Sequence, residues 1–304
     1  MELPASIDVR EVGPRDGLQS QAPLPVEARI RLVDALSGTG VGRIEAGSFV
    51  SPRAVPAMAD SARVFAGIQR RPGVTYSALV PNERGAADAL AAGADRLQVV
   101  VAASESYNAS NVNRTVAQTL DEIAAVVRLA GSTPVDASIS TAWGCPYEGD
   151  VPVQRVLELA RTLLGLGCQA ISLGDTTGMA TPTRVEALLD ALRPLTGAIN
   201  CHFHDTRGTG LANLLAAMQA GCTDFDTAIG GLGGSPTAPG AGGNVASEDA
   251  VHMVEDMGVE TGIDLERLLA AARLAGELLG RPLRGQVLVV GPARPHRGDR
   301  EVAR

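Results

Sequence analysis

The chain has 304 residues, of which 45% are hydrophobic and 20% are charged, and this composition is typical of a folded globular protein. Its formal net charge is -8 and it has no basic cluster, so nucleic acid is not expected as a partner. No uninterrupted apolar run is long enough for a membrane span, and the first residues lack the basic and apolar regions of a signal peptide. We therefore expect a cytoplasmic protein with no membrane partner.

Apolar runs of strand length alternate along the chain with amphipathic segments of helical period. Strands are predicted over 7–12, 42–47, 74–80, 95–102, 135–141, 169–174, 198–204 and 223–229. Helices are predicted over 25–38, 55–70, 84–93, 115–130, 152–167, 182–194 and 209–221, with further helix in 246–280.

This alternation predicts an α/β fold of the (β/α)8 TIM-barrel type with additional C-terminal helices. Eight strand and helix units fit the usual size of such a barrel, and a doubly wound sheet of eight parallel strands is the less economical alternative. No linker rich in Pro, Gly or Ser divides the chain, so we expect one domain over 1–290. The segment 291–304 is rich in Arg and Pro and is expected to be a disordered tail.

Two histidines stand two residues apart at the end of the predicted strand 198–204. Residues two apart in a strand point to the same face, so His202 and His204 can both offer imidazole nitrogens to one metal ion. The alternative is two unrelated polar residues, one of them hydrogen-bonded to a carbonyl group. All 26 basic residues are arginine. Arginine cannot form a Schiff base, so carbon–carbon bond chemistry here would need a metal ion as its electron sink.

Oxygen donors that could complete such a metal site follow the first and eighth predicted strands. Asp16 and Asn244 are expected at the carboxyl-terminal rim, where the functional residues of barrels lie. Two nitrogens plus oxygens suit Mg2+ or Mn2+ better than a closed zinc site. Arg15 can hold the developing enolate oxygen of a reacting carbonyl group. Glu45 ends the second strand and is expected to orient Arg15 or a bridging water, because an unpaired carboxylate there is costly.

Polar side chains follow three more of the predicted strands. Asn82 follows the third strand, Ser104 and Glu105 follow the fourth, and Asp175 follows the sixth. All four are expected at the same rim, so Asn82, Ser104 and Glu105 are candidates for substrate binding.

A glycine-rich stretch follows the eighth strand and includes Gly233, Gly234 and Ser235 before it reaches Asn244. So many glycines indicate either a mobile lid or a cradle of backbone amides that binds an anion. The alternative is a plain flexible connector.

Eight segments, in the same order, resemble the 3-hydroxy-3-methylglutaryl-CoA lyase family of the DRE-TIM metallolyase superfamily. SFVSP and GCPYEG are typical of the lyase branch, and the likeness covers roughly residues 7 to 265. The segments are VREVGPRDGLQ (9–19), GSFVSPRAVPAMAD (47–60), ALVPN (78–82), AASE (102–105), GCPYEG (144–149), ISLGDTTG (171–178), CHFHDTRGTGLAN (201–213) and GLGGSPTAPGAGGNVASED (231–249).

The resemblance implies a retro-Claisen cleavage of a 3-hydroxy-3-methylglutaryl-CoA-like thioester to acetyl-CoA and acetoacetate, with Mg2+ or Mn2+ as cofactor. It also implies roles for seven residues. The metal ligands would be Asp16, His202, His204 and Asn244, the enolate would be held by Arg15, and the supporting acids would be Glu45 and Asp175.

Two positions depart from the family pattern. The family signature GLGGCP has a cysteine that resembles a proton donor to the acetyl-CoA carbanion, and this chain has Ser235 there. A serine hydroxyl is a weaker acid than a thiol, so we expect slower proton delivery. The family also tends to place an aromatic hydroxyl near the substrate where this chain has Ser138. Both changes leave the metal ligands intact, so we expect either slow lyase chemistry or a substrate with a different acyl branch.

Two other kinds of function remain open from the sequence. One is another metal-dependent member of the superfamily, either an acyl-CoA condensing synthase or a 2-oxo acid aldolase. The other is a paralogue that binds an acyl-CoA without turning it over. A homodimer is compatible with such a barrel, although no interface is specified by the sequence.

Overall fold

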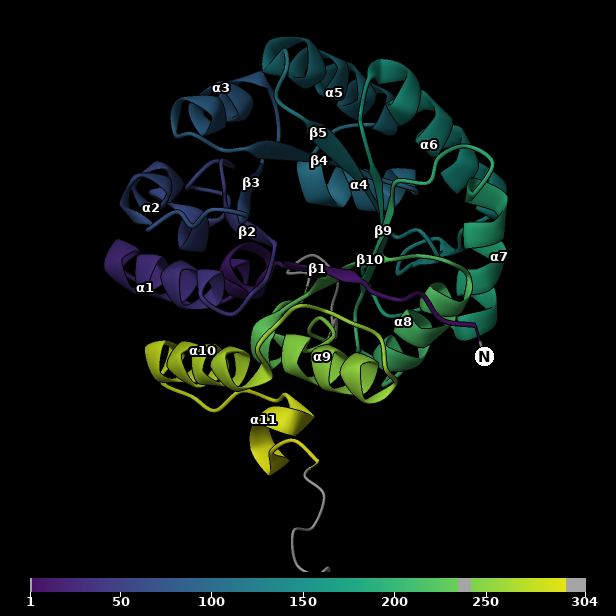
Figure 1. The fold of residues 1–304 in the computed structure, drawn as a ribbon. Helices are drawn as coiled ribbons and strands as arrows, with labels where there is room; N and C mark the ends of the chain where they lie inside the picture. Colours follow the sequence, from purple (N-terminus) through teal and green to yellow (C-terminus); the bar gives the residue numbers. More distant parts are fainter. Residues whose placement is uncertain (1, 235–241, 294–304) are drawn as a thin grey trace, which may run out of the picture.

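The computed structural model of the chain describes residues 2–234 and 242–293, and the predicted tail lies almost wholly outside this range. The described residues form a closed barrel of parallel strands surrounded by helices (Figure 1), which confirms the predicted (β/α)8 fold. Around the barrel the strands follow the order β1, β10, β9, β8, β5, β4, β3, β2. Their bounds are β1 Asp8–Glu11, β2 Arg43–Ser48, β3 Thr75–Leu79, β4 Arg96–Ala102, β5 Val135–Ser140, β8 Ile171–Asp175, β9 Ile199–Phe203 and β10 Asp224–Thr227.

Several positions of the barrel strands carry buried polar side chains, among them Arg10 on β1, Gln98 on β4 and Asp226 on β10. Register places Asp226 of β10 beside His202 of β9 and beside Arg10 of β1. Polar side chains therefore fill the part of the barrel where large aliphatic residues are usual. The strand pairing itself thus brings a charged cluster together beneath the barrel mouth.

Helices cover the outside of the barrel (Figure 1). Helix α10 packs against both α1 and α9 and so closes the helical ring. No helix of the described residues is long and apolar enough to cross a membrane. The outer helices are α1 Val26–Ser37, α2 Ser61–Gly67, α3 Glu83–Ala91, α5 Val116–Ala130, α6 Val153–Leu166, α7 Pro182–Leu192, α8 Gly210–Gln219, α9 Ser247–Asp256, α10 Leu265–Leu279 and α11 Gln286–Val290.

The prediction of one continuous helix over 55–70 is wrong. A short 3-10 turn, η2 (Pro56–Met58), precedes α2, and between them Asp60 adopts a left-handed backbone conformation with φ 57°. The Ser61 hydroxyl donates to the Met58 carbonyl oxygen at 2.8 Å, and Arg29 donates to the Ala59 carbonyl oxygen at 2.5 Å. These side-chain bonds satisfy carbonyl groups that a continuous helix would use, so the chain turns here.

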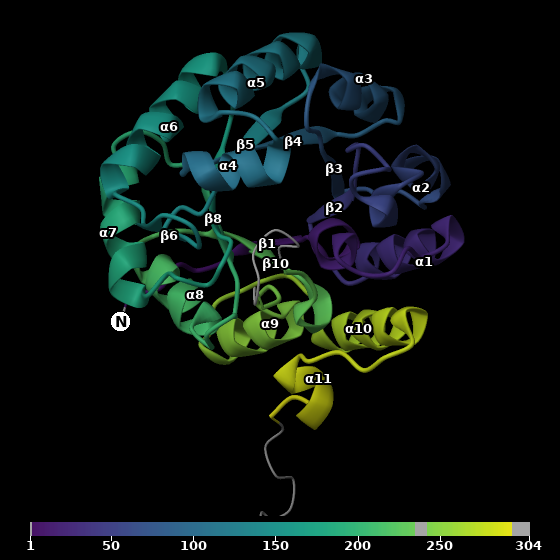
Figure 2. The same cartoon turned by 180° about the vertical axis from the view of Figure 1, so that it is seen from behind.

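Three elements near the barrel mouth were not predicted. A single π-helical turn, η1 (Gly13–Gly17), follows β1, and a small hairpin joins β6 (Gly144–Cys145) to β7 (Gly149–Asp150). Helix α4 (Glu105–Val112) follows β4, and Figures 1 and 2 both show it inside the ring of outer helices. These additions build the walls around the carboxyl ends of the strands.

Candidate active site

A cavity of about 500 Å3 opens at the carboxyl ends of the barrel strands. Its lining includes residues from η1, β2, α4, β5 and β9, which are far apart in the sequence. This is the end at which barrel proteins place their functional residues. Six of the predicted site residues line it directly: Arg15, Asp16, Asn82, Ser138, His202 and His204.

Asp16, His202 and His204 form one cluster, in which a carboxylate oxygen and two imidazole nitrogens lie within 4.8 Å of one another. The histidines come from the end of β9 and the aspartate from η1. The burial of Asp16 opposes its ionisation, but the charges of Arg15 and the two imidazoles outweigh this and lower its pKa. An ionised carboxylate beside two imidazoles is a donor set that fits a divalent cation.

The hydrogen bonds made by the two Nδ1 atoms determine which nitrogen of each imidazole ring faces the cavity. His202 Nδ1 lies 3.1 Å from Asp226 Oδ2, and His204 Nδ1 lies 3.0 Å from the carbonyl oxygen of Gly242. Both Nδ1 atoms must therefore carry hydrogen, which leaves lone pairs on both Nε2 atoms. These two Nε2 atoms are only 3.1 Å apart. Facing lone pairs at this distance repel unless a positive charge, either a proton or a metal ion, lies between or beside them.

The two histidines differ in their affinity for a proton. Burial and then the neighbouring His202 lower the pKa of His204 to about 4. Burial acts in the same direction on His202, but its hydrogen bond to Asp226 outweighs burial and raises the pKa. A metal ion at this site would compete with one proton, held on His202.

Asn244 lies at the same cluster and has one oxygen to spare. Its Nδ2 donates to Asp16 Oδ2 at 2.6 Å and to the Leu232 carbonyl oxygen at 2.9 Å. Its Oδ1 is buried and has no hydrogen-bond partner among the described residues. A buried unpartnered oxygen is costly, and a cation beside Asp16 would satisfy it. The residues present therefore fit a divalent ion.

Gly233 allows the glycine-rich loop to pass close to this cluster. Its φ is 118°, and a Cβ added there would lie 2.3 Å from Asn244 Nδ2 and 2.9 Å from Asp16 Oδ2. Any other residue would collide with two of the candidate ligands. Gly234 also has a positive φ, 121°, and Ser235 lies outside the described residues.

Arg15 forms an ion pair with Glu45, as the position of Glu45 on the second strand predicted. Arg15 Nε donates to Glu45 Oε2 at 2.5 Å and Nη1 donates to Asp16 Oδ1 at 2.9 Å. The register of β2 against β3 shifts between Glu45 and Gly47, a bulge of the kind that often re-aims side chains near sites. The guanidinium is held by two carboxylates, and its Nη2 has no partner among the described residues.

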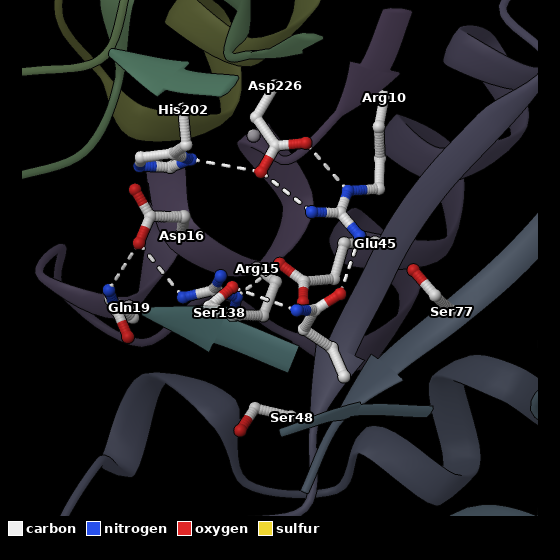
Figure 3. A network of polar contacts seen from close by, with 12 residues as sticks. Arg10, Arg15, Asp16, Gln19, Glu45, Ser48, Ser77, Ser138, His202 and Asp226 are labelled. Atoms are coloured by element: carbon white, nitrogen blue, oxygen red, sulfur yellow. Dashed lines mark hydrogen bonds and ion pairs between the residues drawn. The ribbon is translucent and has the colours of Figure 1, made fainter. Parts of the chain in front are cut away.

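A buried network behind the cluster was missed by the sequence analysis (Figure 3). Asp226 accepts from both Arg10 Nε and Arg10 Nη2 at 2.7 Å, and its Oδ2 also contacts His202. Burial opposes the ionisation of Asp226, yet Arg10 and His202 hold its pKa far below its usual range. Arg10 Nη1 reaches Gln98 Oε1 at 2.6 Å, and Gln98 Nε2 donates to Ser138 Oγ at 2.8 Å. Opposite charges at inward positions of two predicted strands were the signal that could have revealed this pair.

The other predicted residues have mainly structural contacts. Asn82 caps α3 by accepting from Gly85 N at 3.0 Å while also lining the cavity. Ser104 caps α4 and donates to Cys145 Sγ at 3.0 Å, and Glu105 accepts from Val116 N at 2.9 Å. Neither Ser104 nor Glu105 lines the cavity, so the geometry does not support their predicted contact with substrate.

Asp175 ends β8 beside the cluster without lining the cavity. Its Oδ1 accepts from Met179 N at 2.7 Å and Ala180 N at 3.0 Å, and its Oδ2 is buried without a partner among the described residues. Burial raises its pKa to about 6, although these two amides oppose the shift. Asp175 therefore shapes the loop after β8 and retains one free oxygen.

A (β/α)8 barrel with an Asp-His-His cluster, an adjacent arginine and an amide oxygen at its carboxyl end has the architecture of a metal-dependent barrel enzyme. The chain belongs to the HMGL-like family, whose model matches residues 6–275. It is 45% identical over 295 residues to the hydroxymethylglutaryl-CoA lyase YngG of Bacillus subtilis, which covers 95% of this chain and 99% of that protein. It is 44% identical to a 3-hydroxy-3-isohexenylglutaryl-CoA/hydroxymethylglutaryl-CoA lyase of Pseudomonas aeruginosa, over 92% of this chain and 95% of that one.

Solved structures show the same relationship. An HMG-CoA lyase from Acinetobacter baumannii, in complex with coenzyme A and 3-methylmalate, matches with a TM-score of 0.93 and 41% identity over 96% of this chain and 98% of that one. The Bacillus subtilis HMG-CoA lyase matches with a TM-score of 0.93 and 44% identity over 95% and 99% of the two chains. These similarities to carbon–carbon lyases agree with the resemblance found in the sequence motifs.

Proposed function

We propose that this chain is a metal-dependent carbon–carbon lyase that cleaves 3-hydroxy-3-methylglutaryl-CoA, or a related branched 3-hydroxyacyl-CoA, to acetyl-CoA and a 3-oxo acid. The observation that carries the proposal is the cluster of Asp16, His202 and His204 at the cavity, with Arg15 beside it. Asn244, whose Nδ2 contacts Asp16, adds a buried Oδ1 with no partner among the described residues. The acyl-CoA would be the partner, as coenzyme A is in the Acinetobacter baumannii structure.

Asp16, His202, His204 and Asn244 would hold the ion, which we expect to be Mg2+ or Mn2+. When bound, such an ion supplies a Lewis acid that makes the C3 hydroxyl of the substrate easier to deprotonate. Asp226 keeps the His202 ring oriented with Nε2 toward the cavity, and the Gly242 carbonyl group does the same for His204.

Arg15 would stabilise the charge that develops when the C2–C3 bond breaks. Its Nε and Nη1 are committed to Glu45 and Asp16, so the guanidinium cannot swing away and Nη2 is left for the thioester oxygen. A donor held in place before the reaction stabilises an enolate without reorganisation at the moment of bond cleavage. Glu45 would thus act by positioning Arg15.

The acetyl-CoA carbanion then needs a proton, and we assign this step to the loop that contains Ser235. The family signature has a cysteine at this position. Serine is the weaker acid, so we propose that protonation limits turnover of the parent substrate.

Ser138 supports the proposal of a different acyl branch. Its hydroxyl is engaged by Gln98 and it lines the cavity together with Ser48, which is buried and whose Oγ has no partner among the described residues. Small side chains here leave room that an aromatic residue would fill. We propose that the cavity accepts a C3 substituent larger than methyl, as the name of the Pseudomonas aeruginosa relative indicates for that protein.

The proposal is tested by measuring acetyl-CoA release from a series of 3-hydroxy-3-alkylglutaryl-CoA thioesters, with added Mg2+ or Mn2+ and after removal of metal by a chelator. Metal-dependent release from at least one member of the series is expected. Tight binding of these thioesters without any release would instead support the non-catalytic alternative. No release of acetyl-CoA from the thioesters, together with release of free CoA from acetyl-CoA plus a 2-oxo acid, would support a synthase.

A further inference from the structure

Glu11, the last residue of β1, is a buried carboxylate with no place in the chemistry described above. It is 1% exposed. Its Oε1 accepts from Gly13 N at 2.7 Å and from Ile229 N at 3.1 Å, and its Oε2 accepts from the Ser247 hydroxyl at 2.6 Å. One side chain therefore bonds to three segments of the chain.

Each of these three partners begins a segment that leads to the candidate metal centre. Gly13 opens η1, which contains Arg15 and Asp16. Ile229 opens the short turn η3 (Ile229–Gly231), after which the glycine-rich loop begins. Ser247 is the first residue of α9, three residues after Asn244. The two oxygen donors of the centre, Asp16 and Asn244, are thus anchored to the same carboxylate from opposite ends of the chain.

The cost of this arrangement indicates that the three bonds matter. Burial raises the pKa of Glu11 to about 7, although its three hydrogen bonds oppose the shift. Burial of a carboxylate is costly unless hydrogen bonds compensate it, and here three bonds do so. The backbone is also adapted to it, because a Cβ at position 13 would lie 2.6 Å from Glu11 Oε1 and only glycine avoids that contact.

A second buried carboxylate secures the next amide of the same turn. Both oxygens of Glu248 lie within 3.1 Å of Gly230 N, and Glu248 is fully buried. Gly230 has φ 61°, a conformation that glycine adopts without strain. Successive amides of η3 are therefore held by two acidic side chains, one from β1 and one from α9.

We propose that Glu11 is a positioning residue of the metal centre, and that it sets the distance between Asp16 and Asn244 by bonding η1, η3 and the start of α9 together. This inference rests on the proposed metal centre and not on the identity of the substrate. Its direct consequence at the centre is the 2.6 Å contact between Asn244 Nδ2 and Asp16 Oδ2, which requires both segments to be in place.

The test is Mn2+ binding by the full chain, measured by titration calorimetry together with the thermal unfolding midpoint. Glu11→Ala is expected to weaken Mn2+ binding by about tenfold, the lower end of the loss seen when the support of a metal ligand is removed, because η1 and the start of α9 lose their common anchor. Glu11→Gln is expected to restore most of the affinity, because its carbonyl oxygen can accept from both amides and its amide group can donate to Ser247.

Asp249→Ala is the matched control. Asp249 lies two residues from Ser247, and its carboxylate accepts from Gln286 N at 2.8 Å and Val287 N at 2.7 Å, both at the start of α11. This variant should lower the unfolding midpoint while Mn2+ affinity stays at the wild-type value. Equal weakening by Asp249→Ala and Glu11→Ala would show a general loss of stability and overturn the inference.

Two more variants keep the test decisive if Glu11→Ala does not fold. Glu11→Asp keeps the charge but is one methylene shorter and cannot reach all three partners, and Ser247→Ala removes only one bond. Both are expected to weaken Mn2+ binding, Glu11→Asp by more. Wild-type affinity in folded Glu11→Ala or Glu11→Asp, or a Glu11→Gln protein as weak as Glu11→Ala, would overturn the inference. Failure of the wild-type chain to bind Mn2+ would instead count against the proposed function.

Discussion

The two sides of the cavity are built in different ways. The side formed by β1, β9 and β10 is a network of charges in which Arg10, Asp226 and His202 are each held by short contacts (Figure 3). The side formed by β2 and β5 carries small hydroxyl groups, among them Ser48, whose Oγ has no partner among the described residues, and Ser138, whose Oγ accepts from Gln98 Nε2. The first side has little freedom to change without loss of the metal centre, whereas the second can change with the substrate.

The largest expected effect comes from breaking the charged side at its centre. His202→Ala removes a metal ligand, and since a metal ion supplies several kcal/mol of charge stabilisation, acetyl-CoA release should fall at least about a thousandfold. Mn2+ binding measured by calorimetry should be lost in parallel. His252→Ala on α9 is the control and should change neither quantity, because His252 lies outside the cavity lining. Full activity of His202→Ala would remove the basis for a metal-dependent reaction.

A smaller effect is expected from Asp226, which contacts the candidate ligand His202. Asp226→Asn leaves His202 without a carboxylate partner and leaves the buried Arg10 without its counter-charge. Mn2+ affinity should fall by about 10- to 100-fold. Asp224→Asn, two residues earlier on β10, is the control because Asp224 pairs with the partly exposed Arg43 outside the cavity. If the two variants bound Mn2+ equally well, the network behind His202 would have no role in metal binding.

A substitution at Ser235 in the glycine-rich loop is expected to raise activity, whereas the two substitutions above lower activity or Mn2+ affinity. Ser235→Cys supplies a stronger acid, so kcat for 3-hydroxy-3-methylglutaryl-CoA should rise, by about tenfold or more if proton delivery limits turnover. KM and Mn2+ affinity should stay unchanged in the same assay, and Ser235→Ala should be no faster than the wild type. An unchanged kcat in Ser235→Cys with metal still bound would show that protonation does not limit the reaction.

The barrel and the cluster could be predicted because both follow from regular geometry. Residues two apart in a strand share a face, which predicts that His202 and His204 lie together. The functional residues of barrels lie at the carboxyl ends of the strands, which predicts that Asp16 lies beside them. The Ser104 and Glu105 predictions used the same rule but did not allow for α4, which starts at once after β4 and engages both residues in local contacts. A strand end predicts proximity to the rim and does not predict where a side chain points.

The network behind the cluster was missed because it depends on pairing between distant strands, and the opposite charges of Arg10 and Asp226 indicate a pair only once β1 and β10 are placed side by side. Arg10 and Asp226 are 216 residues apart and meet only because β1 and β10 close the barrel. Glu11 was missed for a related reason, since its value lies in joining Gly13 to Ile229 and Ser247 rather than in any local motif. Such contacts need the three-dimensional register, which one sequence does not contain.

On the hydroxyl-lined side the expected effect is limited to the choice between substrates. Ser138→Tyr should fill part of the cavity and reduce kcat/KM for thioesters with a long C3 branch by about 10- to 100-fold relative to the methyl substrate, in line with the cost of excluding a few methylene groups. Ser138→Ala is the control, because it removes the contact with Gln98 without filling space, and it should leave this ratio unchanged. The measurement is the ratio of kcat/KM values for the two substrates in each variant, with Mn2+ affinity as a check on the charged side. A ratio that Ser138→Tyr does not alter would place the C3 branch elsewhere in the cavity, and Ser48 on β2, whose buried hydroxyl has no partner among the described residues, would then be the position to vary.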